Sequence, residues 1–154
     1  MKFLLKNNYS RINKIKSEGK KIVFTNGCFD LLHVGHIKYL FQAKDLGDIL
    51  IIGLNSDKSV KKLKGNNRPI NSFEDRAKLL AALKSVDLVI MFEEQTPENL
   101  IKEIIPDVLV KGGDYDIEEI VGYQTVIDNG GQVKTLSFYE GYSSTNYIDK
   151  INKR

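Results

Sequence analysis

The chain has 154 residues, of which 42% are hydrophobic and 28% are charged. That length is enough for one well-buried domain and too short for two ordinary ones, and the composition is that of a globular protein. No apolar run approaches membrane-spanning length, and residues 1–6 are too short an apolar stretch for a signal peptide, so we expect neither segment. The single cysteine, Cys28, fits a reducing cytoplasm.

The net charge of +3 is unevenly distributed along the chain. Residues 1–21 contain seven Lys or Arg and one acid, Glu18, whereas the rest of the chain carries 16 basic and 19 acidic residues. A solvated helix face explains this N-terminal excess better than contact with nucleic acid, because no basic patch interleaved with aromatic residues accompanies it. We therefore expect a protein that binds neither nucleic acid nor a membrane.

Hydrophobic periodicity and turn residues predict helices and strands that alternate along the chain. Residues 3–17 are predicted to form an amphipathic helix, with Gly19 in the position of a C-terminal cap. The predicted strands cover residues 22–24, 48–54, 86–92, 107–110 and 132–136. Further helices are predicted over residues 34–44, 117–127 and 147–151. Another begins at a capping box, residues 71–74, and runs to residue 83, and one more begins at residues 96–98 with proline in its first position.

Strands that alternate with helices predict an α/β fold with a doubly wound parallel sheet and right-handed crossovers. The sequence shows no internal repeat, low-complexity tract or interdomain linker. We therefore expect an N-terminal helical arm over residues 1–19 and a single domain over residues 20–154. The longest polar stretch, residues 61–71, is predicted to be the most mobile loop.

A buried strand, a glycine turn and a His-x-Gly-His motif follow one another between Val23 and His36. The first turn of a helix presents free backbone N–H groups and a partial positive charge, so it binds phosphate. His33 and His36, the only two histidines, share one face of that turn, and Gly35 leaves room for a ligand near the backbone. The pattern predicts a nucleoside triphosphate site, although an ordinary strand–glycine–helix junction with surface histidines would have the same short motif.

Open α/β sheets bind ligands beyond the carboxyl ends of their strands, where the strand order reverses. Besides the histidine motif, this rule selects residues 55–57, 111–115 and 140–145. Residues 111–114 combine a cation, two glycines and a carboxylate that can accept from a ribose or a base, or they are a simple turn. Residues 143–145 offer hydroxyls and helix N–H groups to the β- and γ-phosphates, or they are an ordinary helix cap.

Three cations are candidates for anion contact. Arg68 and Arg76 can hold phosphate oxygens through paired hydrogen bonds, although an exposed ion pair with Glu74 or Asp75 is an equal alternative for Arg76. Lys44 lies about two to three turns beyond the start of the histidine helix and is either a solvated lysine or a phosphate ligand.

Gly27-Cys28-Phe29-Asp30 together with His33-x-Gly35-His36 resembles the cytidylyltransferase-like branch of the nucleotidyltransferases. Further segments are similar to the adenylyltransferase domain of bacterial heptose-phosphate enzymes: Asn55-Ser56-Asp57, Lys64-Gly65, Arg68-Pro69, Lys111–Tyr115 and Gly141–Asn146. The resemblance covers about residues 20 to 152 and implies a Rossmann-like nucleotidyltransferase fold. It also implies transfer of AMP from ATP to D-glycero-β-D-manno-heptose 1-phosphate, which yields the ADP-heptose used for lipopolysaccharide core.

The resemblance implies roles for individual residues. His33 and His36 are the catalytic residues, ATP is a substrate, and Mg²⁺ travels with its phosphates, with Asp30 as a candidate contact. The implied nucleotide-binding residues are Asn26, Gly27, Cys28, Phe29, Gly35, Lys111, Gly112, Gly113, Asp114, Ser143, Ser144 and Thr145. The implied substrate-binding residues are Asp30, Lys44, Asn55, Asp57, Arg68 and Arg76.

The chain departs from the pattern of these enzymes in two ways. Many members carry this domain behind a sugar-kinase domain, for which 154 residues leave no room, so we expect a separate heptose kinase upstream. Residues 142–145 also lack the arginine that follows in some relatives, so charge near the leaving pyrophosphate must come from elsewhere, with Arg68 and Lys44 as candidates. The sequence does not fix the oligomeric state, and a homodimer is one alternative.

Two other functions stay open at this point. Another enzyme of the same branch would transfer CMP from CTP to glycerol 3-phosphate, or would be an FMN adenylyltransferase. A nucleotide-binding module without catalysis belongs to a different class, and the intact His-x-Gly-His motif argues against it.

Overall fold

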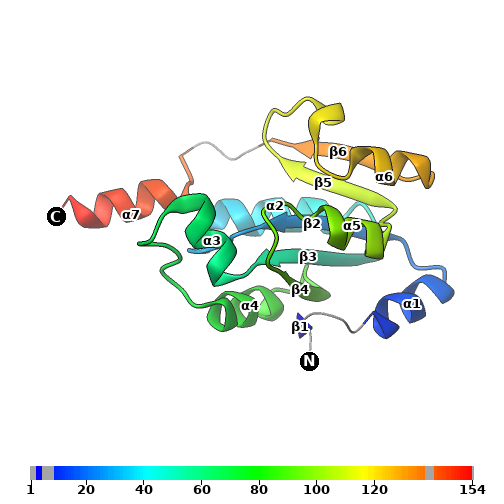
Figure 1. Ribbon diagram of the computed structural model, residues 1–154, viewed down its shortest axis with the longest axis horizontal. Coiled ribbons are helices and arrows are strands. Elements are labelled where there is room, and N and C mark those ends of the chain that lie inside the picture. The colour runs from blue at the N-terminus through cyan, green and yellow to red at the C-terminus, as the bar shows by residue number, and fades with distance from the viewer. Residues whose placement is uncertain (1–2, 5–8, 138–140, 154) are drawn as a thin grey trace.

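The computed structural model describes residues 3–4, 9–137 and 141–153. A six-stranded sheet forms its centre, and every pair of neighbouring strands runs parallel. Helices cover both faces of the sheet (Figure 1), so the predicted doubly wound α/β fold is confirmed.

The central strands are buried on both faces, as is typical of a parallel sheet. In chain order the strands are β1 (Phe3–Leu4), β2 (Ile22–Gly27), β3 (Ile49–Asn55), β4 (Leu88–Phe92), β5 (Val108–Gly112) and β6 (Gln132–Leu136). The helices are α1 (Ser10–Ser17), α2 (Val34–Lys44), α3 (Asp57–Lys64), α4 (Phe73–Ala82), α5 (Glu98–Ile104), the 3₁₀ turn η1 (Ile117–Glu119), α6 (Tyr123–Asp128) and α7 (Ser144–Asn152).

The course of the chain across the sheet reverses between β2 and β5. The strand order is β1-β4-β3-β2-β5-β6, so the chain moves outward from β2 to β4 and then returns past β2 to β5. β2 pairs with β3 along its whole length but with β5 only at Val23 and Phe24. The loops that leave the carboxyl ends of β2 and β5 therefore emerge at the position where open α/β sheets bind ligands.

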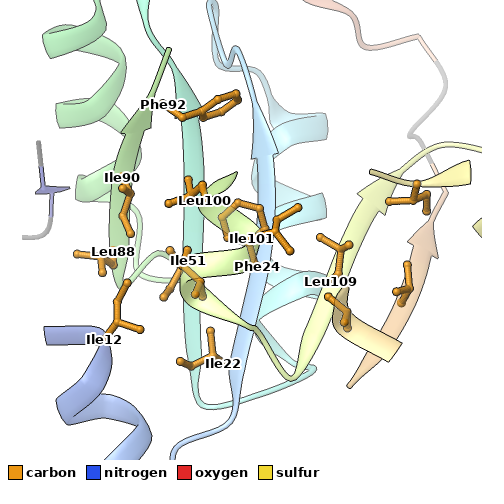
Figure 2. Packing of buried hydrophobic residues seen from close by; sticks show 14 residues of the cluster. Ile12, Ile22, Phe24, Ile51, Leu88, Ile90, Phe92, Leu100, Ile101 and Leu109 are labelled. Carbon is orange, nitrogen blue, oxygen red and sulfur yellow. The ribbon is translucent and has the colours of Figure 1, made fainter. Parts of the chain in front are cut away.

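Two apolar layers hold the sheet between its helices. On one face, Phe24 and Ile51 of the central strands pack in one cluster with Leu100 and Ile101 of α5 (Figure 2). The layer on the other face joins the sheet to α2 and α4. Each fully buried large apolar side chain contributes about 1.5–3 kcal/mol, so these layers are the main source of stability.

The N-terminal segment differs from its prediction. α1 is shorter than the predicted helix over residues 3–17, because Phe3–Leu4 forms an edge strand that pairs with β4. Pairing with an exposed strand edge satisfies backbone groups that a helix would satisfy internally. The end of α1 is as predicted: Gly19 has a φ of +68°, and the N–H of Lys20 donates to the carbonyl of Ile15.

Other elements differ from their predictions in their bounds: β4 begins at Leu88 rather than at residue 86, and α7 begins at Ser144 rather than at residue 147. The helix predicted over residues 117–127 is divided into η1 and α6, because Gly122 between them has a φ of +91°. The cap of α4 is Ser72 rather than Asn71, and its Oγ accepts from the backbone N–H of Asp75 at 3.3 Å. α5 begins one residue after the predicted proline start, at Glu98.

Helix α3 lies in a segment for which no helix was predicted. Its residues are mostly polar, and only Ser59 and Val60 are buried. The local signal is Ser56, whose side chain caps the helix by accepting from the N–H of Ser59. No helix in the described ranges is both long and apolar enough to cross a membrane.

A substitution at Gly122 tests the packing of α5 against α6. A Cβ there would lie 2.6 Å from Cδ1 of Ile101. We expect Gly122→Ala to lower the free energy of unfolding by about 2–5 kcal/mol, because left-handed strain adds to overpacking.

Gly130→Ala is the matched control for chemical denaturation. The φ of Gly130 is +79°, but no atom lies within 4 Å of an added Cβ, so only the strain of about 1–2 kcal/mol applies. Equal losses in the two variants would contradict the packing argument.

Candidate active site

The two histidines form one compact unit at the start of α2. His33 is the N-cap of the helix, and its Nδ1 accepts a hydrogen bond from the backbone N–H of His36 at 3.3 Å. The two rings stack with their centroids 3.7 Å apart. Gly35 permits this arrangement, because a Cβ at that position would lie 3.1 Å from Nδ1 of His33. The histidine motif thus presents its imidazoles at a helix N-terminus, as predicted from the spacing.

The surroundings of both imidazoles favour their neutral forms. Burial, and to a smaller extent the neighbouring His33 and the ammonium of Lys64, together lower the pKa of His36 to about 4. Burial also lowers the pKa of His33 below its ordinary value. Neutral imidazoles can donate an N–H to a phosphate oxygen, but they do not supply positive charge to it.

The loop after β2 packs directly against the histidines. Phe29 has a φ of +45°, and its ring lies 5.2 Å from the ring of His36. Gly27 makes room for this ring, because a Cβ there would lie 2.9 Å from Cε2 of Phe29. Burial raises the pKa of the Cys28 thiol despite the nearby cations, and its Sγ donates to Oδ1 of Asn55 at 3.8 Å. The thiol therefore stays protonated, and Cys28 helps to join the ends of β2 and β3.

The end of β5 meets the end of β2 at the reversal of the sheet. Nζ of Lys111 donates to Oδ1 of Asn26 at 3.3 Å, and burial lowers the pKa of this lysine. Gly112 is the last residue of β5, Gly113 follows with a φ of +111° and is buried, and Asp114 is exposed. These predicted nucleotide-site residues therefore lie at the predicted edge of the sheet, and their contacts with ATP stay a prediction.

The C-terminal segment lies against the histidines. Ser144 Oγ donates to the carbonyl of Leu31 at 2.8 Å, and Ser143 caps α7. The rings of Tyr142 and Tyr147 lie 6.1 and 5.9 Å from the ring of His33. Thr145 is exposed at the start of the helix. The predicted phosphate segment is thus beside His33, but residue 140, at its start, falls outside the described residues.

Asp30 and Arg68, both predicted to contact a ligand, form a buried ion pair with each other. The carboxylate of Asp30 accepts from Nε of Arg68 at 2.5 Å and from the backbone N–H groups of Ile70 and Asn71. Burial alone would raise the pKa of Asp30, but these donors together hold it below its ordinary value. The oxygens of Asp30 are thereby engaged within the protein, and its contact with Mg²⁺ or substrate stays a prediction. Arg68 anchors the loop that was predicted to be mobile.

Arg76 has a structural role within the fold. Its guanidinium is fully buried, and donates to the carbonyls of Asn71 and Cys28 and to Oδ1 of Asp57, at 3.1, 2.7 and 2.7 Å. Its ion pair is with Asp57 and not with Glu74 or Asp75, and its contact with phosphate stays a prediction. Asp57, predicted to bind substrate, is its partner, and Asn55 is buried and donates to Ser59 Oγ.

Lys44 lies at the amino ends of the strands, whereas the histidines lie at their carboxyl ends. Its Nζ donates to the carbonyl of Asp48, just before β3, and to Oδ2 of Asp87, just before β4, at 2.5 Å for the latter. The amino ends of the strands meet there, so the position of Lys44 does not support its predicted contact with substrate or with the leaving pyrophosphate. Its partners are distant in sequence, and helix spacing alone could not exclude this position.

The structure adds three side chains to the candidate site. Lys64, at the end of α3, acts electrostatically on both His36 and Cys28, while Tyr142 and Tyr147 lie beside His33. The sequence signal for Lys64 is Ser56, because this residue caps the start of α3 and α3 ends at Lys64. Tyr142 lies within residues 140–145, which the sheet rule had selected, whereas Tyr147 had no local signal.

A parallel doubly wound sheet with stacked histidines at a helix N-terminus beside its switch point defines the nucleotidyltransferase class. Residues 24–150 match the cytidylyltransferase-like family, and the chain belongs to that family.

Similar proteins include longer ones. The bifunctional protein HldE of Haemophilus ducreyi is 61% identical over 136 residues, which are 88% of this chain and 29% of that protein. HldE of Hydrogenovibrio crunogenus is 55% identical over 145 residues, which are 94% of this chain and 30% of that protein. The chain therefore spans less than a third of the length of these relatives.

Two solved structures are similar in fold. The lipopolysaccharide core biosynthesis protein from Thermoplasma volcanium has a TM-score of 0.64 and 31% identity, over 81% of this chain and all of that one. Pantoate–β-alanine ligase from Francisella tularensis has a TM-score of 0.64 at 16% identity, over 98% of this chain and 77% of that one, so it shares the fold alone.

Breaking the Asp30–Arg68 pair tests whether it anchors the loop. We expect Arg68→Met to lower the free energy of unfolding by about 3–5 kcal/mol, because it leaves a buried carboxylate without its cation. Adding Asp30→Asn should recover most of this loss, since the amide oxygen can still accept from Ile70 and Asn71. Chemical denaturation measures both variants, and Lys62→Met, at an exposed position of the preceding helix, is the control.

The same pair gives a defined pH dependence. The folded pKa of Asp30 lies below its ordinary value of 3.8, so its stabilisation is present above that pH and is lost as the pH falls through the folded pKa. The stability difference between the wild type and the double variant should therefore shrink as the pH drops below 3.8. A constant difference down to the acid transition would contradict the ion pair.

Proposed function

We propose that this domain transfers AMP from ATP to D-glycero-β-D-manno-heptose 1-phosphate, forming ADP-heptose and releasing pyrophosphate. The observation that carries the proposal is the stacked His33–His36 pair at the start of α2, in a chain 61% identical to part of an HldE protein. The placement of Lys111 and of Ser144 around the same edge supports it.

The acceptor in this reaction needs no general base. A sugar 1-phosphate is anionic at neutral pH, so its oxygen attacks the α-phosphorus directly. The bond between the α-phosphorus and the bridging oxygen to the β-phosphate breaks, and pyrophosphate leaves with that oxygen. The protein must align the two phosphates and stabilise the charge that develops between them.

The residues near the reversal of the sheet suit these two tasks. The imidazoles of His33 and His36 can donate to phosphate oxygens, and the first N–H groups of α2 have no acceptor inside the helix. Lys64 and Lys111 bring positive charge to the same region from α3 and β5. In the proposed reaction these lysines supply the positive charge for which the sequence suggested Arg68 and Lys44.

Mg²⁺ would neutralise charge on the triphosphate when bound. The described residues contain no group of three or more His, Cys, Asp or Glu side chains that could hold a metal ion. Asp30 is engaged by three donors. Mg²⁺ usually keeps several waters and binds through substrate phosphates with one or two carboxylates, so in the proposed reaction the nucleotide carries the ion.

The chemistry of the acceptor also requires an earlier step. A kinase reaction must phosphorylate the sugar at C1 before this transfer, and we propose that a heptose kinase acts upstream, in the cytoplasm. A homodimer is compatible with the transfer and is not required by it.

A substrate panel tests the proposed reaction. The protein is mixed with Mg²⁺, with ATP or CTP, and with heptose 1-phosphate, other sugar 1-phosphates, glycerol 3-phosphate or FMN. Pyrophosphate release and product masses are measured. We expect ADP-heptose from ATP. A preference for CTP with glycerol 3-phosphate, or product only with FMN, would contradict the proposal, as would ATP binding without turnover on any acceptor.

Removing each imidazole tests the catalytic assignment. We expect His36→Ala to lower turnover by about a hundredfold to a thousandfold while changing ATP affinity much less, because the donor acts on charge in the transition state. Steady-state kinetics and ATP titration measure the two effects. Lys102→Ala, in an exposed ion pair on α5, is the control, and near-normal turnover of His36→Ala would refute the role.

A further inference from the structure

The cap of α2 restricts which ring nitrogen of His33 carries the proton. Nδ1 of His33 accepts from the backbone N–H of His36. In a neutral imidazole one nitrogen is the donor and the other the acceptor, so a nitrogen that accepts has no proton of its own. While the cap is in place, the proton of neutral His33 therefore sits on Nε2.

Gly35 controls whether the ring can reach this position. A Cβ at residue 35 would lie 3.1 Å from Nδ1 and 3.2 Å from Cε1 of His33, and 3.0 Å from Cβ of Tyr142. The methyl group of an alanine there would lie closer than an ordinary van der Waals contact both to His33 and to Tyr142. It would push the imidazole away from the N–H that it caps.

The surroundings of the ring oppose a second proton. The ring of His36 stacks on one side, and the rings of Tyr142 and Tyr147 lie near it from the C-terminal segment. Lys64, on α3, is the charged neighbour that acts on His36. Across the described part of the chain, no carboxylate is among the groups that shift the pKa of either histidine.

We propose that His33 is a locked neutral donor: the first turn of α2 fixes its Nε2–H tautomer, and Gly35 is the positioning residue that keeps the ring there. The use of this donor rests on the proposed function, in which Nε2–H donates to a nucleotide phosphate oxygen. No proton is transferred in that contact. The histidine motif then works as a single unit, because the cap, the glycine and the stacked ring each fix the same N–H.

Nitrogen NMR on the free protein reads the tautomer directly. The chain has only two histidines, so ¹⁵N-histidine labelling reports two imidazoles, and the loss of signals in His33→Asn assigns them. At about pH 7.5, above the ordinary histidine pKa, we expect Nδ1 of His33 to have the shift of an unprotonated nitrogen and Nε2 that of a protonated one. A protonated Nδ1, or an imidazolium at this pH, would overturn the proposal.

Gly35→Ala tests the positioning role in the same spectrum. We expect the two nitrogens of His33 to move toward the averaged shifts of an exchanging tautomer mixture. Ser72→Ala, which removes the cap of α4 instead, should leave both imidazoles unchanged. Wild-type shifts in Gly35→Ala would overturn the role of the glycine, and the wild-type spectrum decides the tautomer even where that variant does not fold.

Kinetics test the use of the donor. The side-chain oxygen of His33→Asn can still cap α2, but the residue has no counterpart of Nε2–H. We expect a melting temperature close to that of the wild type and a turnover about a hundredfold to a thousandfold lower. The wild-type kcat/KM should not decline between about pH 7 and about pH 8.5, whereas an imidazolium donor would be lost as the pH rises.

The two readouts separate this inference from the proposed function. The NMR measurement needs no substrate. An unlocked His33 in an enzyme that makes ADP-heptose overturns the inference alone. A locked His33 in a protein that transfers AMP to no sugar phosphate overturns the proposed function alone.

Discussion

The arrangement of the site depends on one buried guanidinium. Arg76 is fully buried and binds Cys28 after β2, Asp57 at the start of α3 and Asn71 just before α4. A buried cation without partners is strongly destabilising, so the fold holds only where all three segments arrive together. The ring of Phe73, 5.8 Å from the guanidinium, covers a further part of it. The carboxyl ends of β2 and β3 and the entry to α4 are thereby fixed to one point.

This one point sets the geometry of the histidines and of Lys64. The carbonyl of Cys28 is held by Arg76, and the next residue, Phe29, takes up a positive φ that brings its ring against His36. On the other side Asp57 opens α3, which ends at Lys64 beside the same imidazole. The histidine pair is thus positioned by a backbone carbonyl and by the starts of helices.

The sheet apart from β1, the helices apart from α3 and the histidine motif were predictable, because apolar runs and a strand–turn–helix signal are local patterns. The roles of Arg68, Arg76 and Lys44 were not, because each depends on a partner 38 or more residues away: Asp30, Cys28 and Asp87. Sequence spacing shows that an arginine is near a loop, but it does not show whether a buried carboxylate already neutralises it. The strand at Phe3–Leu4 was missed for a related reason, since only the edge of β4 makes it extended.

These pairings determine where positive charge is left for a triphosphate. Asp30 neutralises Arg68 and Asp57 neutralises Arg76, so both guanidiniums stabilise the fold without crowding the site with like charges. The surroundings of both histidines favour their neutral forms, and burial lowers the pKa of Lys111. The free protein therefore avoids much of the self-repulsion that a cluster of buried cations would cause. A bound anion would raise the pKa of Lys111 and so favour its charged form. The positive electrostatic potential at the anion would then come from Lys111, Lys64 and the N-terminus of α2.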